Sequence, residues 1–71
     1  MNNTLNCAIV GFGYMGQIRL KTISKIPKLS VKIVCDSNIE NIPFSKKYKI
    51  NNNFNDIFKE QIDIVFVCTP N

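Results

Sequence analysis

The chain contains no histidine and no tryptophan, and only three of its 71 residues are cysteine. Without histidine, three widely spaced cysteines are too few for a zinc site and too few for a disulfide framework. We therefore expect no metal ligands in this chain. Free thiols suit a reducing compartment such as the cytoplasm, and we expect Cys7, Cys35 and Cys68 to serve as small apolar residues in strands.

Long apolar runs are also absent. The longest, Ile64–Cys68, is far shorter than the roughly 20 residues that cross a bilayer. The start of the chain, Met1–Asn6, lacks the basic residues and the apolar stretch of a signal peptide. The sequence therefore predicts neither membrane insertion nor secretion.

Acidic residues are in the minority, with five Asp and Glu against nine Lys and Arg, which gives a net charge of +4. The basic residues do not form one cluster, so we expect solvated faces and no nucleic-acid partner. Hydrophobic residues make up 45% of the chain. This composition is typical of a folded globular chain, and the length allows one small domain or part of a larger one.

Hydrophobic patterning in the first half predicts two strands and a helix. A nearly continuous apolar run at Leu5–Val10 is typical of a parallel strand covered on both faces, and a second strand is expected at Ser30–Cys35. Between them, apolar residues three and four apart predict an amphipathic helix over Tyr14–Ile26, which Pro27 ends. Its expected inward face consists of Met15, Ile18, Thr22, Ile23 and Ile26.

The second half has weaker signals until its last strand. A helix is expected over Pro43–Tyr48 with Phe44, Ser45 and Tyr48 inward, and a weak strand over Ile50–Asn53. A short helix is expected from an N-cap at Asn55 to Glu60, with Ile57 or Phe58 buried. The last strand is expected over Asp63–Cys68. This regular alternation predicts an α/β fold with a parallel sheet and right-handed crossovers. The expected architecture is a Rossmann-like βαβαβαβ half with strand order 3-2-1-4.

A glycine motif lies between the first strand and the first helix. Its residues are Gly11, Phe12, Gly13, Tyr14, Met15 and Gly16, which match GxGxxG. In this pattern Gly11 allows a tight turn, Gly13 lets a pyrophosphate approach the backbone, and Gly16 lets the helix pack closely. Because the helix N-terminus points free N–H groups at the phosphates, the motif predicts dinucleotide binding.

Asp36 follows the second strand about 20 residues after Gly16, where a carboxylate accepts hydrogen bonds from the adenosine ribose. Its charge would repel a 2′-phosphate, and neither Ser37 nor Asn38 is an Arg that would accept one. The sequence therefore favours NAD over NADP, with Ser37 beside the ribose site. Taken singly, the glycines could form an ordinary turn and Asp36 a cap; together they favour a cofactor site.

These motifs resemble the Gfo/Idh/MocA oxidoreductases, typified by glucose-fructose oxidoreductase and inositol dehydrogenase. Met15 before the third glycine is a narrower match than GxGxxG alone, and the segment Asp63–Asn71 is similar to the family's fourth strand and its Thr-Pro-Asn signature. Arg19 stands where members often carry a His. The resemblance covers the whole chain and implies contacts near the nicotinamide ribose from Cys68, Thr69, Pro70 and Asn71.

The resemblance further implies that residues 1–71 are the N-terminal part of an NAD(P)-binding domain of an oxidoreductase acting on a sugar or polyol. The family's Glu-Lys-Pro motif and its substrate domain, with the catalytic Lys and His, would come after Asn71, so we assign no catalytic residue here. Two alternatives are a non-catalytic nucleotide-binding sensor or interaction module and an S-adenosylmethionine-dependent methyltransferase. The complete GxGxxG motif and the Thr-Pro-Asn ending favour the oxidoreductase over the methyltransferase.

The expected strand order leaves the strand over Asp63–Cys68 at one edge of the sheet. This strand is apolar and contains no Lys, Pro or Gly that would discourage pairing with another chain. We therefore expect the chain to form a homo-oligomer through this edge.

Overall fold

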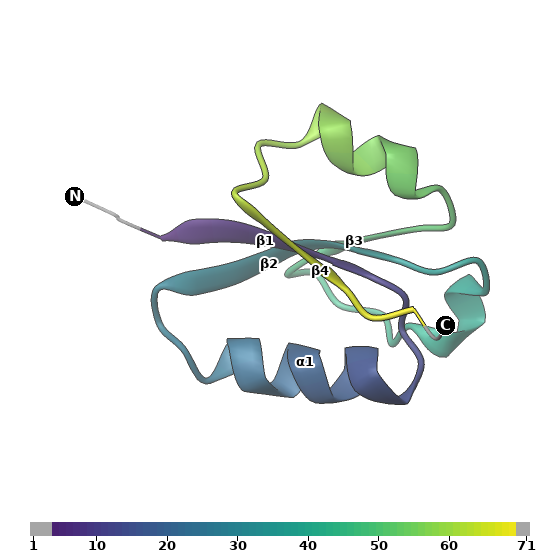
Figure 1. The fold of residues 1–71 in the computed structure, drawn as a ribbon, viewed down its shortest axis with the longest axis horizontal. Coiled ribbons are helices and arrows are strands. Elements are labelled where there is room, and N and C mark those ends of the chain that lie inside the picture. The colour runs from purple at the N-terminus through teal and green to yellow at the C-terminus, as the bar shows by residue number, and fades with distance from the viewer. Residues whose placement is uncertain (1–3, 70–71) are drawn as a thin grey trace.

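The structure is a computed structural model that describes residues 4–69. Its elements in chain order are β1 (Leu5–Val10), α1 (Tyr14–Ser24), β2 (Leu29–Cys35), the 3-10 helix η1 (Ile39–Asn41), β3 (Lys49–Asn51), the 3-10 helix η2 (Phe54–Lys59) and β4 (Ile64–Val67). The four strands form one parallel sheet in the order β3-β2-β1-β4 (Figure 1). The predicted α/β fold and its strand order are therefore confirmed.

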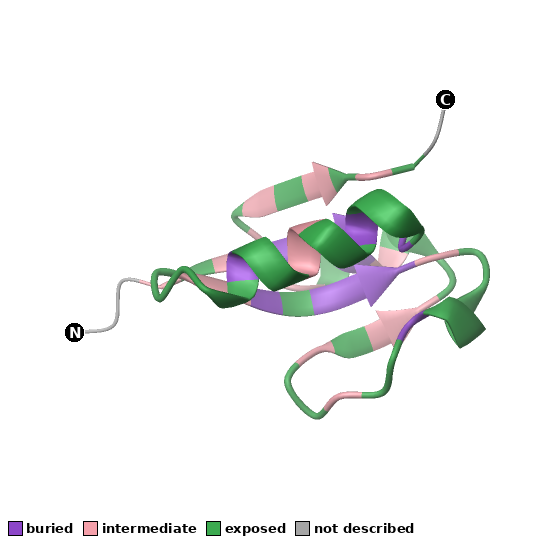
Figure 2. Cartoon of the chain, turned by 90° about the horizontal axis from the view of Figure 1, so that it is seen from below, coloured by how far each residue is buried: buried purple, intermediate pink, exposed green. Residues whose placement is uncertain are grey.

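The sheet is covered on both faces, by α1 on one side and by the segment around η2 on the other (Figure 1). Neighbouring residues of β1 point to opposite faces. Cys7 and Ile9 belong to the apolar cluster on the α1 side, whereas Ala8 belongs to the cluster that contains Ile57 of η2. Because all three β1 residues are fully buried, the continuous apolar run has the two-sided burial expected of it (Figure 2).

Helix α1 forms as expected, but its expected inward face is confirmed only at Ile23, and Thr22 is exposed. Its buried residues are Gly16 and Ile23, and Leu20 packs against the core between them. In contrast, Met15, Ile18 and Ile26 are exposed. Gly16 lies against the glycine loop, and this contact rotates the helix so that positions 16, 20 and 23 share the buried stripe. Full burial of Ile23 contributes about 1.5–3 kcal/mol relative to an exposed side chain.

The helix expected over Pro43–Tyr48 is absent, so that prediction was wrong. The Tyr48 hydroxyl donates a hydrogen bond to the carbonyl of Pro43 over 2.8 Å, and the Ser45 hydroxyl accepts one from the N–H of Lys47 over 3.1 Å. These side-chain bonds to the backbone compete with helix formation. Phe44 is 84% exposed, so this segment also lacks the apolar stripe that would dock a helix on the sheet.

Several boundaries differ from expectation. α1 ends at Ser24 and not at Ile26, and β2 and β3 each begin one residue earlier than predicted, at Leu29 and Lys49. β3 ends at Asn51, two residues earlier than predicted, and β4 is the central part of the predicted Asp63–Cys68 strand. The short helix η2 is capped by Asn53 and not by Asn55, because the Asn53 side chain accepts a hydrogen bond from the N–H of Asn55. Of the two residues expected to be buried there, the structure buries Ile57 and exposes Phe58.

The edge strand β4 is less covered than the central strands. Along β4, the half-buried Ile64 and Phe66 alternate with the exposed Val65 and Val67, so one face of this strand is covered less than the faces of β1.

No helix among residues 4–69 has the length and hydropathy needed to cross a bilayer.

Candidate functional site

The loop between β1 and α1 lies at the carboxyl ends of the central strands, the edge where open parallel sheets bind ligands. Gly11 has a φ of +92°, in the left-handed region that favours glycine. Its N–H donates a hydrogen bond to the carbonyl of Cys35 over 2.7 Å. A Cβ at Gly11 would come within 2.9 Å of the main-chain nitrogen of Thr69. Gly11 therefore makes a turn that fits between the ends of β2 and β4.

Gly16 and Gly13 have opposite surroundings. A Cβ at Gly16 would collide with the carbonyl oxygen of Gly11, so the missing side chain lets the first turn of α1 lie on the loop. A Cβ at Gly13 would meet no atom within 4 Å. Gly13 is also the N-cap of α1, where no side chain caps the helix and no acidic residue occupies the first turn. The free N–H groups of this turn are thus open to an anion.

Asp36 is fixed beside the loop by hydrogen bonds from the backbone. Its Oδ2 accepts a bond from the N–H of Phe12 over 2.5 Å, and its Oδ1 accepts one from the N–H of Asn38 over 2.8 Å. Each carboxylate oxygen can accept more than one hydrogen bond, so capacity for ligand hydroxyls remains. Asp36 therefore joins the loop to the end of β2 and still faces the site.

A first hollow of about 540 Å³ opens at this place. Its lining residues are Val10, Gly11, Gly13, Cys35, Asp36, Ser37, Asn52, Phe54 and Thr69. Asp36 is the one charged residue in this lining. The volume lies within the range of small-molecule and cofactor pockets. The structure thus brings together five residues that the sequence singled out, namely Gly11, Gly13, Asp36, Ser37 and Thr69.

A second hollow of about 330 Å³ lies between α1 and the end of β4. Its lining residues are Gly13, Tyr14, Met15, Arg19, Val67, Cys68 and Thr69. Gly13 and Thr69 line both hollows, so the two spaces flank the open glycine. The N–H of Cys68 bonds to the carbonyl of Val10 over 2.7 Å, which holds this segment beside β1.

Three of the predicted site residues need separate mention. The Phe12 side chain is 2% exposed and packs in the core, so only its main chain faces the loop region. Pro70 and Asn71 lie outside the described residues.

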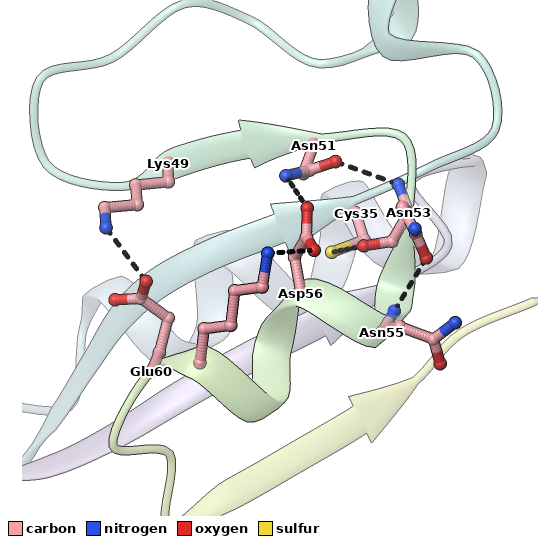
Figure 3. Close-up of polar contacts among 8 residues, drawn as sticks. Cys35, Lys49, Asn51, Asn53, Asn55, Asp56 and Glu60 are labelled. Carbon is pink, nitrogen blue, oxygen red and sulfur yellow. Dashed lines mark hydrogen bonds and ion pairs between the residues drawn. The ribbon is translucent and has the colours of Figure 1, made fainter.

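Sequence reasoning missed Asn52 and Phe54 of the first hollow. A chain of side-chain hydrogen bonds shapes the loop that carries them (Figure 3). The Asn51 side chain accepts a bond from the N–H of Asn53 over 3.0 Å and donates one to Asp56, and the Asn53 side chain accepts one from the N–H of Asn55 over 3.0 Å. The available signal was the run of three Asn at 51–53, which begins at the last residue of β3 and so places polar residues at the ligand-binding edge of the sheet.

The buried thiols are poor nucleophiles in this environment. Burial raises the pKa of Cys35, which lines the first hollow, and the negative charge of Asp56 raises it further. Burial likewise raises the pKa of Cys7. Thiols held in the protonated form pack as apolar groups and do not attack a substrate. Among residues 4–69, no three Cys, Asp or Glu side chains gather in the way that metal ligands do.

The comparison with protein families agrees with this geometry. The GFO_IDH_MocA family model, described as the oxidoreductase family with an NAD-binding Rossmann fold, matches residues 5–71. The matched range includes the glycine loop, Asp36 and all four strands. No match was found among the curated proteins.

Proposed function

Because the chain belongs to the GFO_IDH_MocA oxidoreductase family, whose domain is an NAD-binding Rossmann fold, we propose that this site binds NAD across its two hollows. One observation carries the proposal. Gly13 is open at an uncapped helix N-terminus, and this position lies between the two hollows. A pyrophosphate seated at Gly13 would receive the N–H groups of the first turn of α1, with one nucleoside on each side.

The adenosine half belongs to the first hollow in this proposal. Asp36 accepts the ribose hydroxyls there, with Ser37 beside it. Among residues 4–69, no Lys or Arg lines this hollow to neutralise a 2′-phosphate, and Asp36 would repel one. This charge distribution supports NAD as the cofactor in preference to NADP. The ring of Phe54 and the amide of Asn52 are available to stack on and hydrogen-bond the adenine.

The nicotinamide half belongs to the second hollow, beside Cys68 and Thr69. The family resemblance extends this contact to Pro70 and Asn71. When bound, the nicotinamide supplies the hydride chemistry, and the residues of this chain bind and orient it. We propose that residues 1–71 are the N-terminal part of the cofactor domain of a cytoplasmic enzyme. Its substrate, a sugar or polyol, would be held by residues outside this sequence.

Calorimetric titration of the chain with NAD, NADP and S-adenosylmethionine tests the proposal. We expect NAD to bind more tightly than NADP, and S-adenosylmethionine not to bind. Binding of S-adenosylmethionine without NAD would indicate a methyl-transfer module instead. Binding of none of the three by a folded chain would overturn the proposed function.

A further inference from the structure

Among the described residues 4–69, Arg19 is the one charged residue that lines the second hollow. Its guanidinium carbon lies 5.8 Å from the centroid of the Phe66 ring on β4. At this distance the ring face attracts the cation and restricts its motion. The side chain is half-buried, so the charge is held in a defined place at the wall of the hollow and is not free in solvent.

Helix geometry places this residue on the side of α1 that borders the second hollow. Met15 and Arg19 are four residues apart and therefore lie on one flank of α1, the flank that faces β4. Helical side chains lean toward the helix N-terminus, and the N-terminus of α1 is Gly13. Arg19 and Gly13 both line the second hollow, so the guanidinium and the open glycine border one space.

The charge also lacks a counter-charge. Within residues 4–69, the ion pairs are Lys49 with Glu60 and Lys59 with Asp56, and Arg19 takes part in neither. In the same described part of the chain, no acidic residue lines the second hollow. A cation that is partly desolvated and unpaired in this way is suited to an anionic ligand group.

We propose that Arg19 binds the phosphate on the nicotinamide side of the dinucleotide pyrophosphate. This inference rests on the proposed function. A pyrophosphate at Gly13 has one phosphate toward each hollow, and Arg19 lies in the second hollow alone. The N–H groups of α1 serve the pyrophosphate as a whole, whereas the guanidinium adds a charge-assisted hydrogen bond to one phosphate. Phe66 restricts the guanidinium before the ligand arrives, so less side-chain entropy is lost on binding.

Titration of the chain with AMP, ADP-ribose and NAD tests this assignment. AMP carries only the adenosine-side phosphate, ADP-ribose carries both phosphates without nicotinamide, and NAD carries all groups. The variant Arg19→Gln removes the charge. Lys21→Gln is the matched control, since Lys21 is exposed on the same helix and lines neither hollow. Arg19→Lys keeps the charge and the fold but loses the planar guanidinium.

We expect Arg19→Gln to weaken ADP-ribose and NAD binding by about tenfold each, which corresponds to about 1.4 kcal/mol, and to leave AMP binding within about twofold. Arg19→Lys is expected to weaken the same two ligands by about threefold, and Lys21→Gln to change all three by less than about twofold.

Three results would overturn the inference while leaving the proposed function in place. They are unchanged affinities in Arg19→Gln, an equal loss for AMP, and a loss confined to NAD, which would place Arg19 on the nicotinamide ring. Failure of the unmutated chain to bind NAD would overturn both proposals. Thermal unfolding of each variant verifies that the affinities belong to folded protein.

Discussion

The backbone N–H of Phe12 donates a hydrogen bond to Oδ2 of Asp36 over 2.5 Å, which links the glycine loop to the residue directly after β2. The other carboxylate oxygen accepts a bond from the N–H of Asn38. One side chain therefore positions both the loop and the turn that leads to η1. Because these bonds join residues far apart in the sequence, Asp36 contributes to the shape of the site as well as to its charge.

Asp36→Asn is expected to narrow the preference for NAD over NADP, because it removes the negative charge that would face a 2′-phosphate. The substituted side chain has one acceptor oxygen in place of two, so the N–H of either Phe12 or Asn38 loses its charged partner. We expect the free energy of unfolding to fall by about 1–3 kcal/mol as a result. Calorimetry and urea denaturation measure the two effects. Glu40→Gln is the control, since Glu40 is exposed in η1 and lines neither hollow. Equal affinity of the unmutated chain for both cofactors would contradict this role for Asp36.

Gly13→Val is expected to abolish dinucleotide binding with the fold largely retained. The backbone of Gly13, with φ −78° and ψ −152°, is extended and accepts a branched residue, and the new side chain would occupy the open space above the helix N-terminus. Gly16→Ala should instead destabilise the fold, because the new Cβ would collide with the carbonyl oxygen of Gly11. This collision outweighs the helix propensity of Ala, which is favoured over Gly by about 1 kcal/mol. Circular dichroism measures whether each variant is folded, and calorimetry measures its affinity for the dinucleotide. A folded Gly13→Val variant with unchanged affinity would mean that the turn is purely structural.

Phe54→Ala is expected to weaken both AMP and NAD binding about tenfold, since stacking of a base on an aromatic ring contributes about 1–3 kcal/mol. Phe58→Ala is the matched control. It removes the same ring from the same 3-10 helix, but Phe58 is 79% exposed and lines neither hollow. Equal affinities of the two variants would exclude Phe54 from the adenine site.

Patterns that depend on neighbours in the chain predicted most of the fold. The continuous apolar run of β1 indicated a strand buried on both faces, and the position of the glycine motif between a strand and a helix located the loop. The alternation of strands and helices indicated a parallel sheet with right-handed crossovers, and the Rossmann pattern of the glycine motif supplied the strand order.

Features that depend on one tertiary contact could not be predicted in this way. The rotation of α1 follows from the contact between Gly16 and the Gly11 carbonyl, which no spacing of apolar residues encodes. The placement of Phe54 at the first hollow depends on Asn51, whose side chain bonds both to Asp56 and to the next turn of the loop. Such side-chain bonds are a property of the folded loop, and the sequence predicted a weak strand over Ile50–Asn53 in its place.

The three thiols are expected to react at two different rates. Cys68 is half-buried and should react first with a thiol reagent, whereas Cys7 and Cys35 are buried and should react only through unfolding. Cys68→Ser should remove the fast phase alone. Three equal rates in folded protein would contradict the burial of Cys7 and Cys35.

The same burial predicts a loss of stability in alkali. Burial raises the pKa of Cys35 above its ordinary value of 9.0, and the charge of Asp56 adds to this; burial also raises the pKa of Cys7. Above about pH 9 the unfolded chain therefore releases protons that the folded chain keeps, so this contribution to stability is complete below pH 9 and declines as the pH rises. Burial of Tyr48 acts in the same direction from its ordinary pKa of 10.0. Urea denaturation from pH 7 to 10 measures the decline, and a constant free energy of unfolding would contradict it.

The outer edge of β4 is expected to pair with a second copy of the chain. The sheet ends at β3 on one side and at β4 on the other. β3 is three residues long and begins with Lys49, which are features that discourage edge pairing, whereas β4 contains only Ile, Val and Phe. Its Val65 and Val67 are 43% and 70% exposed. An antiparallel two-fold pairing of β4 would satisfy the outer backbone groups and set Val65 and Val67 beside side chains of the second copy on one face of the joined sheet.

We therefore expect a dimer at micromolar concentration, and expect Val65→Lys to shift it to monomer because lysine on an edge strand discourages pairing, and the two-fold axis would bring two such charges close together. Ile39→Lys is the control, since Ile39 is similarly exposed at 47% but lies in η1, outside the sheet. Light scattering measures the mass of each variant across a dilution series. A stable monomer of the unmutated chain would contradict this pairing, and so would a dimer that Val65→Lys leaves intact, because the association would then use a surface other than the β4 edge.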